Sequence, residues 1–112
     1  MITTHVLDTA KGRPAAGVGI VLERASGTND WHTIGSGHTD ADGRLKTLWP
    51  TSEPLTAGVY RLTFDTARYF AETGTASFYP HVVIVFEAVA GETHYHVPLL
   101  LNPFGYTTYR GS

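Results

Sequence analysis

Apolar and polar residues alternate with a period of two along most of this chain, and turn signals recur about every 8–12 residues. The clearest example is the segment from Val59 to Asp65, in which Tyr60, Leu62 and Phe64 share one face. Successive side chains of a strand point to opposite faces of its sheet, so this alternation is typical of a half-buried strand. The pattern therefore predicts an all-β sandwich of about eight strands.

The predicted strands are separated by segments rich in Gly, Pro, Asp and Asn, which favour turns. Strands are expected over residues 4–8, 18–23, 31–39, 59–65, 81–88, 94–101 and 106–109, with another short one directly after Arg44. The 81–88 strand is rich in β-branched residues and is expected to be buried on both faces. Residues 11–14 are expected to form a turn.

Two local features qualify this all-β pattern. Gly35 and Gly37 fall inside the 31–39 strand, where they either weaken the strand or allow a close backbone approach. One short helix is expected after the 59–65 strand, capped by Asp65 or Thr66 and ended by Gly74. The residues of its expected apolar stripe are Ala67, Phe70 and Ala71.

The length of 112 residues is close to the common domain size, so one domain over residues 1–112 is expected. A formal net charge of -2 without a basic run argues against nucleic-acid and membrane-surface partners. The chain has no cysteine for a disulfide or a thiolate. Its first residues lack the features of a signal peptide, and no apolar run approaches the ~20 residues that span a bilayer. A cytoplasmic location is expected.

Three predicted strands each carry a polar or titratable side chain beside an apolar or small one on the same face. These pairs are His5 with Leu7, His96 with Leu100, and Tyr109 with Thr107. Arg44 follows the tight turn from Asp40 to Gly43, at the rim of the short strand expected there. The four polar residues form one site only if the fold brings their strands together.

Two motifs raise the question of a metal. His94 and His96 point the same way on a strand, as half a zinc site would require, but no cysteine and no second such motif is present. Asp40 and Asp42 with Gly43 resemble the start of a calcium loop, yet its twelfth position is Thr51 rather than Glu. No metal or other cofactor is predicted.

Two histidines, an arginine and a tyrosine without a metal are suited to general acid–base hydrolysis. A neutral imidazole near pH 7 can accept a proton from water. A guanidinium can hold a carbonyl or a carboxylate through two parallel hydrogen bonds and stabilise developing negative charge. This set fits a small, polar, carbonyl-rich substrate.

Three stretches of the chain also carry a family resemblance. They are residues 4–8 (Thr-His-Val-Leu-Asp), residues 39–44 (Thr-Asp-Ala-Asp-Gly-Arg) and residues 94–112, which end in Tyr-Arg-Gly-Ser. In these stretches the chain resembles the transthyretin-related proteins, and within them the 5-hydroxyisourate hydrolase branch. The terminal Tyr-Arg-Gly-Ser is the most specific part, because it separates the hydrolases of this family from hormone-carrying transthyretin.

The resemblance implies a transthyretin-like β-sandwich of two four-stranded sheets with one short helix. It implies a homotetramer whose active sites lie in a central channel where dimers meet, covering the face that carries Leu7, Pro98 and Leu100. It also implies hydrolysis of 5-hydroxyisourate to 2-oxo-4-hydroxy-4-carboxy-5-ureidoimidazoline, a step of urate catabolism. The functional positions that it implies are His5, Arg44 and His96 as catalytic residues, with Tyr109, Arg110, Gly111 and Ser112 as further substrate-binding residues.

In the mechanism that we expect, His5 or His96 takes a proton from water, which attacks the lactam carbonyl. Arg44 holds the polarised oxygen or an anionic edge of the substrate, and an imidazolium protonates the leaving nitrogen. The terminal residues close the pocket. Two alternatives are a transthyretin-like carrier of a small ligand and a β-sandwich interaction module with a solvated tail.

Overall fold

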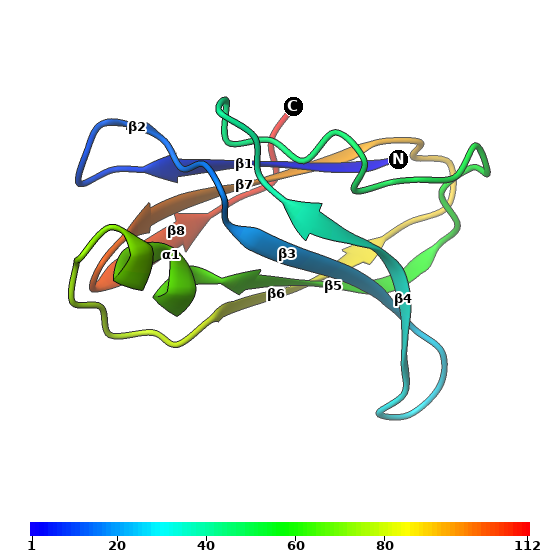
Figure 1. The fold of residues 1–112 in the computed structure, drawn as a ribbon. Coiled ribbons are helices and arrows are strands. Elements are labelled where there is room, and N and C mark those ends of the chain that lie inside the picture. The colour runs from blue at the N-terminus through cyan, green and yellow to red at the C-terminus, as the bar shows by residue number, and fades with distance from the viewer.

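In the computed structural model, which describes residues 1–112, eight strands form two four-stranded sheets with one short helix (Figure 1). The elements in chain order are β1 (Ile2–Asp8), β2 (Arg13–Pro14), β3 (Gly19–Ala25), β4 (Trp31–His38), β5 (Gly58–Asp65), α1 (Thr66–Glu72), β6 (Val82–Ala88), β7 (Tyr95–Asn102) and β8 (Gly105–Thr108). The predicted all-β sandwich of two four-stranded sheets is confirmed.

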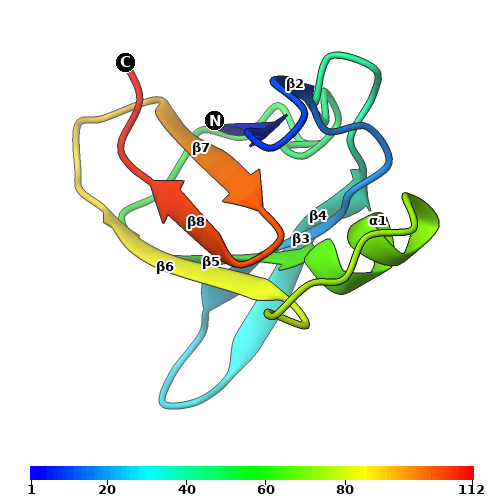
Figure 2. The same ribbon diagram turned by 90° about the vertical axis from the view of Figure 1, so that its left-hand side faces the viewer.

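The strand order is β2-β1-β7-β8 in the first sheet and β4-β3-β5-β6 in the second. All neighbouring strands are antiparallel except β1 and β7, which run parallel. The two sheets face each other, and the edge strands β6 and β8 lie on the same side of the sandwich (Figure 2). Tyr60, Leu62 and Phe64 of β5 are fully buried between the sheets, as the alternation predicts.

Strand β1 determines which side chains of the first sheet face outward. Its burial alternates strictly, with Thr4 and Asp8 buried and His5 half-buried on the outer face. The buried polar groups have partners: Thr4 Oγ1 donates to the Val97 carbonyl at 2.6 Å, and the Tyr69 hydroxyl donates to Asp8 Oδ2 at 2.7 Å. Burial and this carboxylate raise the pKa of Tyr69 to about 12. The satisfied bonds remove the cost of burying polar groups and fix the register of β1.

Three expectations about the strands were wrong. Residues 81–88 are not buried on both faces, because β6 is an edge strand with an uncovered outer face, and Val83 and Val85 are exposed. Residues 11–14 are not only a turn, since Arg13–Pro14 forms β2 against the end of β1. The sheet edge tolerates this proline because its missing N–H faces away from the ladder. The chain after Arg44 forms no strand and makes a single bridge to His5.

The two glycines of β4 explain why the segment after Arg44 forms no strand. A Cβ on Gly35 would lie 2.1 Å from the Leu48 carbonyl oxygen, and one on Gly37 would lie 2.9 Å from Leu45 Cδ1. The segment therefore packs directly onto β4, with Leu48 buried in the core. Of the two predicted roles of these glycines, the close backbone approach is confirmed, and it anchors the segment that follows Arg44.

The helix ends as predicted but buries a different face. Gly74, at φ +68°, follows the last turn, and the Thr75 N–H bonds to the Phe70 carbonyl at 2.8 Å in a Schellman arrangement. At the other end, Asp65 is the N-cap residue but makes no side-chain capping bond. Tyr69 and Phe70 are buried, whereas Ala71 is exposed, so the expected stripe is wrong at that residue. No helix in the chain is long and apolar enough to cross a membrane.

Candidate active site

The outer face of the first sheet brings His5 and Arg44 side by side. The two residues form an isolated antiparallel bridge, and the Val6 N–H donates to the Gly43 carbonyl at 2.8 Å. Gly43 has φ +76°, and a Cβ there would lie 2.3 Å from the Val6 carbonyl oxygen and 3.3 Å from His5 Cδ2. A side chain at Gly43 would therefore push the turn off β1 and separate Arg44 from His5.

Asp40 shapes the turn that presents Arg44. Its Oδ1 accepts hydrogen bonds from the N–H groups of Asp42 at 2.9 Å and Arg44 at 3.1 Å. The Asp40 N–H in turn donates to the Arg44 carbonyl at 2.7 Å. The hydrogen bond from the Arg44 N–H is the main cause that lowers the pKa of Asp40. The predicted Asp–Gly turn is confirmed, and the ionised carboxylate holds it closed.

His96 lies on the same outer face, on the neighbouring strand β7. Its Nδ1 lies 2.8 Å from Thr3 Oγ1, and Thr3 is directly opposite His96 in the parallel register of β1 and β7. Burial lowers the pKa of His96, and the charges of Arg44, His94 and His5 lower it further. An imidazole with this pKa stays neutral around pH 7 and can accept a proton.

The C-terminal residues are held against His96 through Gly111. The Gly111 N–H donates to the His96 carbonyl at 2.7 Å, and the two residues form an isolated bridge. A Cβ on Gly111 would lie 2.7 Å from His96 Cδ2 and 3.3 Å from Pro98 Cγ. Pro98 is consequently buried within the single chain, which corrects the expectation that it forms open surface with Leu7 and Leu100.

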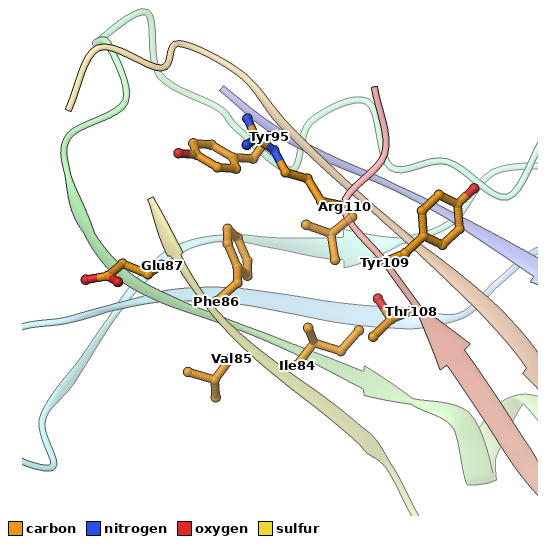
Figure 3. Close-up of a pocket in the computed structure, with 9 residues that line it drawn as sticks. Ile84, Val85, Phe86, Glu87, Tyr95, Thr108, Tyr109 and Arg110 are labelled. Atoms are coloured by element: carbon orange, nitrogen blue, oxygen red, sulfur yellow. The ribbon is translucent and has the colours of Figure 1, made fainter. Parts of the chain in front are cut away.

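Arg110 and Tyr109 take opposite sides of this tail. The Arg110 guanidinium lies 4.5 Å from the centroid of the Tyr95 ring, and its Nη2 lies 3.5 Å from Glu92 Oε2. Figure 3 shows Arg110 and Tyr95 on one side of the tail and Tyr109 on the other. Arg110 borders a hollow of about 250 Å³ at the open edge between β6 and β8. In the single chain, Arg110 anchors the tail and does not reach the histidines.

The structure thus gathers His5, Arg44, His96 and Gly111 on one face, whereas Arg110 is directed elsewhere. Tyr109 and Ser112 are exposed. None of the four cavities of the chain is lined by His5, Arg44 or His96, so their face is open in the single chain. No three His, Cys, Asp or Glu side chains gather closely enough to hold a metal ion.

Sequence reasoning missed Thr3. The alternation of β1 places Thr3 on the face of His5, and this signal could have marked it. Its contact with His96 needed the pairing of β1 with β7, which joins residues more than 90 positions apart in the chain. The close approach of Gly43 to the His5 ring could not be predicted from the sequence either.

The fold and its outer face define a transthyretin-like β-sandwich. The sequence matches the model of the HIUase/Transthyretin family over residues 2–111, and the chain belongs to that family. It is 46% identical to 5-hydroxyisourate hydrolase of Mus musculus over 112 residues, covering 99% of this chain and 94% of the mouse protein.

Two solved structures place this relationship in three dimensions. The Klebsiella pneumoniae 5-hydroxyisourate hydrolase superposes with a TM-score of 0.84 at 38% identity, covering 99% of this chain and 98% of that one. Sea bream transthyretin in complex with thyroxine gives a TM-score of 0.90 at 37% identity, covering 98% of this chain and 93% of that one. The fold alone therefore does not distinguish a hydrolase from a carrier, and the residues of the site are needed to distinguish them.

Proposed function

We propose that this protein hydrolyses 5-hydroxyisourate to 2-oxo-4-hydroxy-4-carboxy-5-ureidoimidazoline, a step of urate catabolism. The observation that carries the proposal is that His96, His5 and Arg44 lie together on one outer face, where burial lowers the pKa of His96. Such a shifted imidazole beside a guanidinium is suited to proton transfer at a polarised carbonyl. The similarity to the mouse and Klebsiella 5-hydroxyisourate hydrolases supports this substrate.

In the proposed reaction, His96 takes a proton from water while the water oxygen attacks the lactam carbonyl carbon. Arg44 stabilises the negative charge that develops on the carbonyl oxygen. The carbon–nitrogen bond then breaks, and the His96 imidazolium returns its proton to the leaving nitrogen. His5, beside Arg44, holds the substrate, and we assign the base to His96 because its ring is oriented by Thr3 and Gly111.

The open face of the site supports a homotetramer. One chain supplies a floor of His5, Arg44 and His96 without an opposing wall, and a facing copy would close it into a channel. Dimers would form along the free edges of β6 and β8, which lie on one side of the sandwich, where Val83 and Val85 are exposed. Sedimentation at micromolar concentration tests this assembly, and a monomer there would contradict it.

The C-terminal tail completes the proposed site. Gly111 packs on the His96 ring and Arg110 ties the tail to Tyr95, so Tyr109 and Ser112 extend from an anchored segment. We propose that Tyr109 and Ser112 contact the substrate and that Arg110 and Gly111 hold them in place. Deleting residues 109–112 should abolish turnover and preserve the fold, whereas a β-sandwich interaction module would keep both its fold and its binding partner.

The second candidate is a small-ligand carrier, favoured by the superposition on sea bream transthyretin in complex with thyroxine. Arg44 and two imidazoles make the proposed channel floor polar, which suits a small heterocycle better than an apolar ligand. A binding titration with thyroxine separates the two functions. Micromolar binding without hydrolysis would favour the carrier.

The deciding experiment generates 5-hydroxyisourate in place, from urate and urate oxidase, and follows its ultraviolet absorbance. We expect the intermediate to disappear faster with this protein than by spontaneous decay. Decay at the spontaneous rate would overturn the proposed function. We also propose a cytoplasmic location, which fractionation of the source cells would test. We propose a single domain over residues 1–112, which limited proteolysis of the purified protein would test.

A further inference from the structure

His94 has no part in the reaction proposed above, yet it is joined to His96 by a single hydroxyl group. Thr3 Oγ1 lies 2.9 Å from His94 Nε2 and 2.8 Å from His96 Nδ1. The contact with His96 is partly buried, and the contact with His94 is exposed. The three side chains therefore form one hydrogen-bonded chain that runs from solvent to the His96 ring.

The donor and acceptor roles in these two hydrogen bonds determine which tautomer His96 adopts. A threonine hydroxyl has one hydrogen to donate, and a neutral imidazole carries one N–H. If Thr3 donates to His94, it accepts from His96 Nδ1–H, which leaves His96 Nε2 with a free lone pair. If Thr3 donates to His96 Nδ1 instead, the proton of neutral His96 lies on Nε2, and that nitrogen cannot act as a base. The hydrogen bond at one ring nitrogen thus sets the tautomer at the other.

The protonation state of His94 biases these donor and acceptor roles. A protonated His94 carries a hydrogen on Nε2 and donates it to Thr3, which frees the Thr3 hydrogen for His96 Nδ1. A neutral His94 can accept from Thr3 instead. The positive charge of Arg44 then favours a lone pair over an N–H on the nitrogen that Thr3 does not hold. One proton on His94 therefore opposes the base form of His96 without a change of fold.

Other charged groups also lie near these two hydrogen bonds. His5 and Arg44 act on His96 from β1 and from the turn beside it. The amino group of Met1 donates to the Thr93 carbonyl, directly before His94. Arg110 of the tail is paired with Glu92, two residues before His94. Substitutions at Thr3 leave all of these charged groups unchanged.

We propose that Thr3 is a positioning residue for His96, which selects the tautomer with a free Nε2, and that a proton on His94 reverses this selection. The proposal rests on the proposed function, in which His96 is the base. It adds a regulation of that site by pH, transmitted through a residue that does not touch the substrate. The hydrogen-bonded chain itself exists without substrate and can be observed directly.

The first test observes the imidazoles of the full chain by ¹⁵N NMR as a function of pH. In the wild type we expect His96 to carry its proton on Nδ1 while His94 is neutral, and to shift toward Nε2–H as His94 becomes protonated. Thr3→Val keeps the β-branched shape suited to a strand but removes the hydroxyl, so His96 should lose the single tautomer. Thr3→Ser keeps the hydroxyl and should restore it. Identical His96 shifts in the wild type and Thr3→Val would overturn the proposal.

The second test measures hydrolysis by the same variants. We expect Thr3→Val to lower kcat about 10- to 100-fold, as losses of an orienting partner typically do, with little change in KM. Thr3→Ser should stay close to the wild type. His94→Gln should remove one protonation from the acid limb of the kcat profile, and an unchanged limb would contradict the role of His94.

The two tests fail separately. A wild-type chain that hydrolyses nothing would refute the proposed function, while the NMR data would still show whether Thr3 selects the tautomer. A wild-type chain that hydrolyses the substrate, with Thr3→Val equal to it in kcat, pH profile and His96 shifts, would refute the positioning role alone.

Discussion

The outer faces of the two sheets both carry arginine and histidine side chains, and they differ in how these groups are held. On the second sheet, Arg61 donates from Nε and Nη2 to Glu23 Oε1 at 3.0 and 2.8 Å, and its guanidinium lies 4.1 Å from the Trp31 ring centroid. On the first sheet, Arg44 makes no ion pair with a carboxylate, and its charge contributes to the lowered pKa of His96.

This difference separates structural charges from functional ones. The Arg61 guanidinium already has a carboxylate and an aromatic ring as partners within the protein, so it is not available to bind a ligand. Arg44 and His96 instead share a face where charge is left unbalanced, and burial keeps the imidazole neutral. Groups with perturbed pKa values and unsatisfied charge are the usual mark of a functional site. The substitutions of His96 and Arg44 on the first sheet are therefore compared with matched substitutions of His38 and Arg61 on the second sheet.

The largest expected effect follows from replacing His96 with Asn. Loss of a general base typically lowers the rate by about 10²- to 10⁴-fold. The urate oxidase coupled assay measures this loss. His38→Asn, on the outer face of the second sheet, is the matched control and should hydrolyse like the wild type. Equal activity of both variants would remove His96 from the role of base.

Replacing Arg44 with Lys should cost about 10²-fold in kcat, because an ammonium cannot make the bidentate contact that stabilises the developing oxyanion. The control is Arg61→Lys, which should keep full activity and lose at most about 1 kcal/mol of stability, as partly exposed ion pairs do. Kinetics and urea unfolding measure the two quantities. Wild-type turnover of Arg44→Lys would show that the charge alone suffices.

Gly111→Ala should lower activity about tenfold through displacement of a catalytic group. A methyl group at this position would lie 2.7 Å from His96 Cδ2, so the ring or the tail has to move. Gly105→Ala is the matched control on the same sheet, since its nearest contact is at 3.8 Å, an ordinary van der Waals distance. Equal kcat values for the two variants would mean that the tail does not hold the ring.

The smallest effect is on stability. Burial is the main reason that the pKa of His96 is lowered in the folded chain, so the unfolded chain binds this proton more readily. The stability that neutral His96 contributes is present above its unfolded pKa of about 6.5 and is lost as the pH falls through the folded value. We expect Tm to decrease on acidification more in the wild type than in His96→Asn. A parallel decrease in both would contradict this assignment.

Much of the fold follows from local patterns. The period of two in β1, β5 and β7 predicted which residues of each strand share a face, and the glycine after α1 predicted its end. The predictions failed where burial depends on neighbours. Residues 81–88 have a composition typical of a central strand, but β6 lies at an edge, and the strand expected after Arg44 gives way to packing on Gly35 and Gly37.

The sequence by itself determined the sandwich, the faces of its strands and the residue types of the site. Alternation and turn chemistry are local, and they constrain His5, Arg44 and His96 one element at a time. Only the tertiary structure decided which of them meet. The parallel pairing of β1 with β7 places Thr3 against His96, and the return of the tail places Gly111 on the same ring. These contacts join residues far apart in the chain, and no local periodicity encodes such distances.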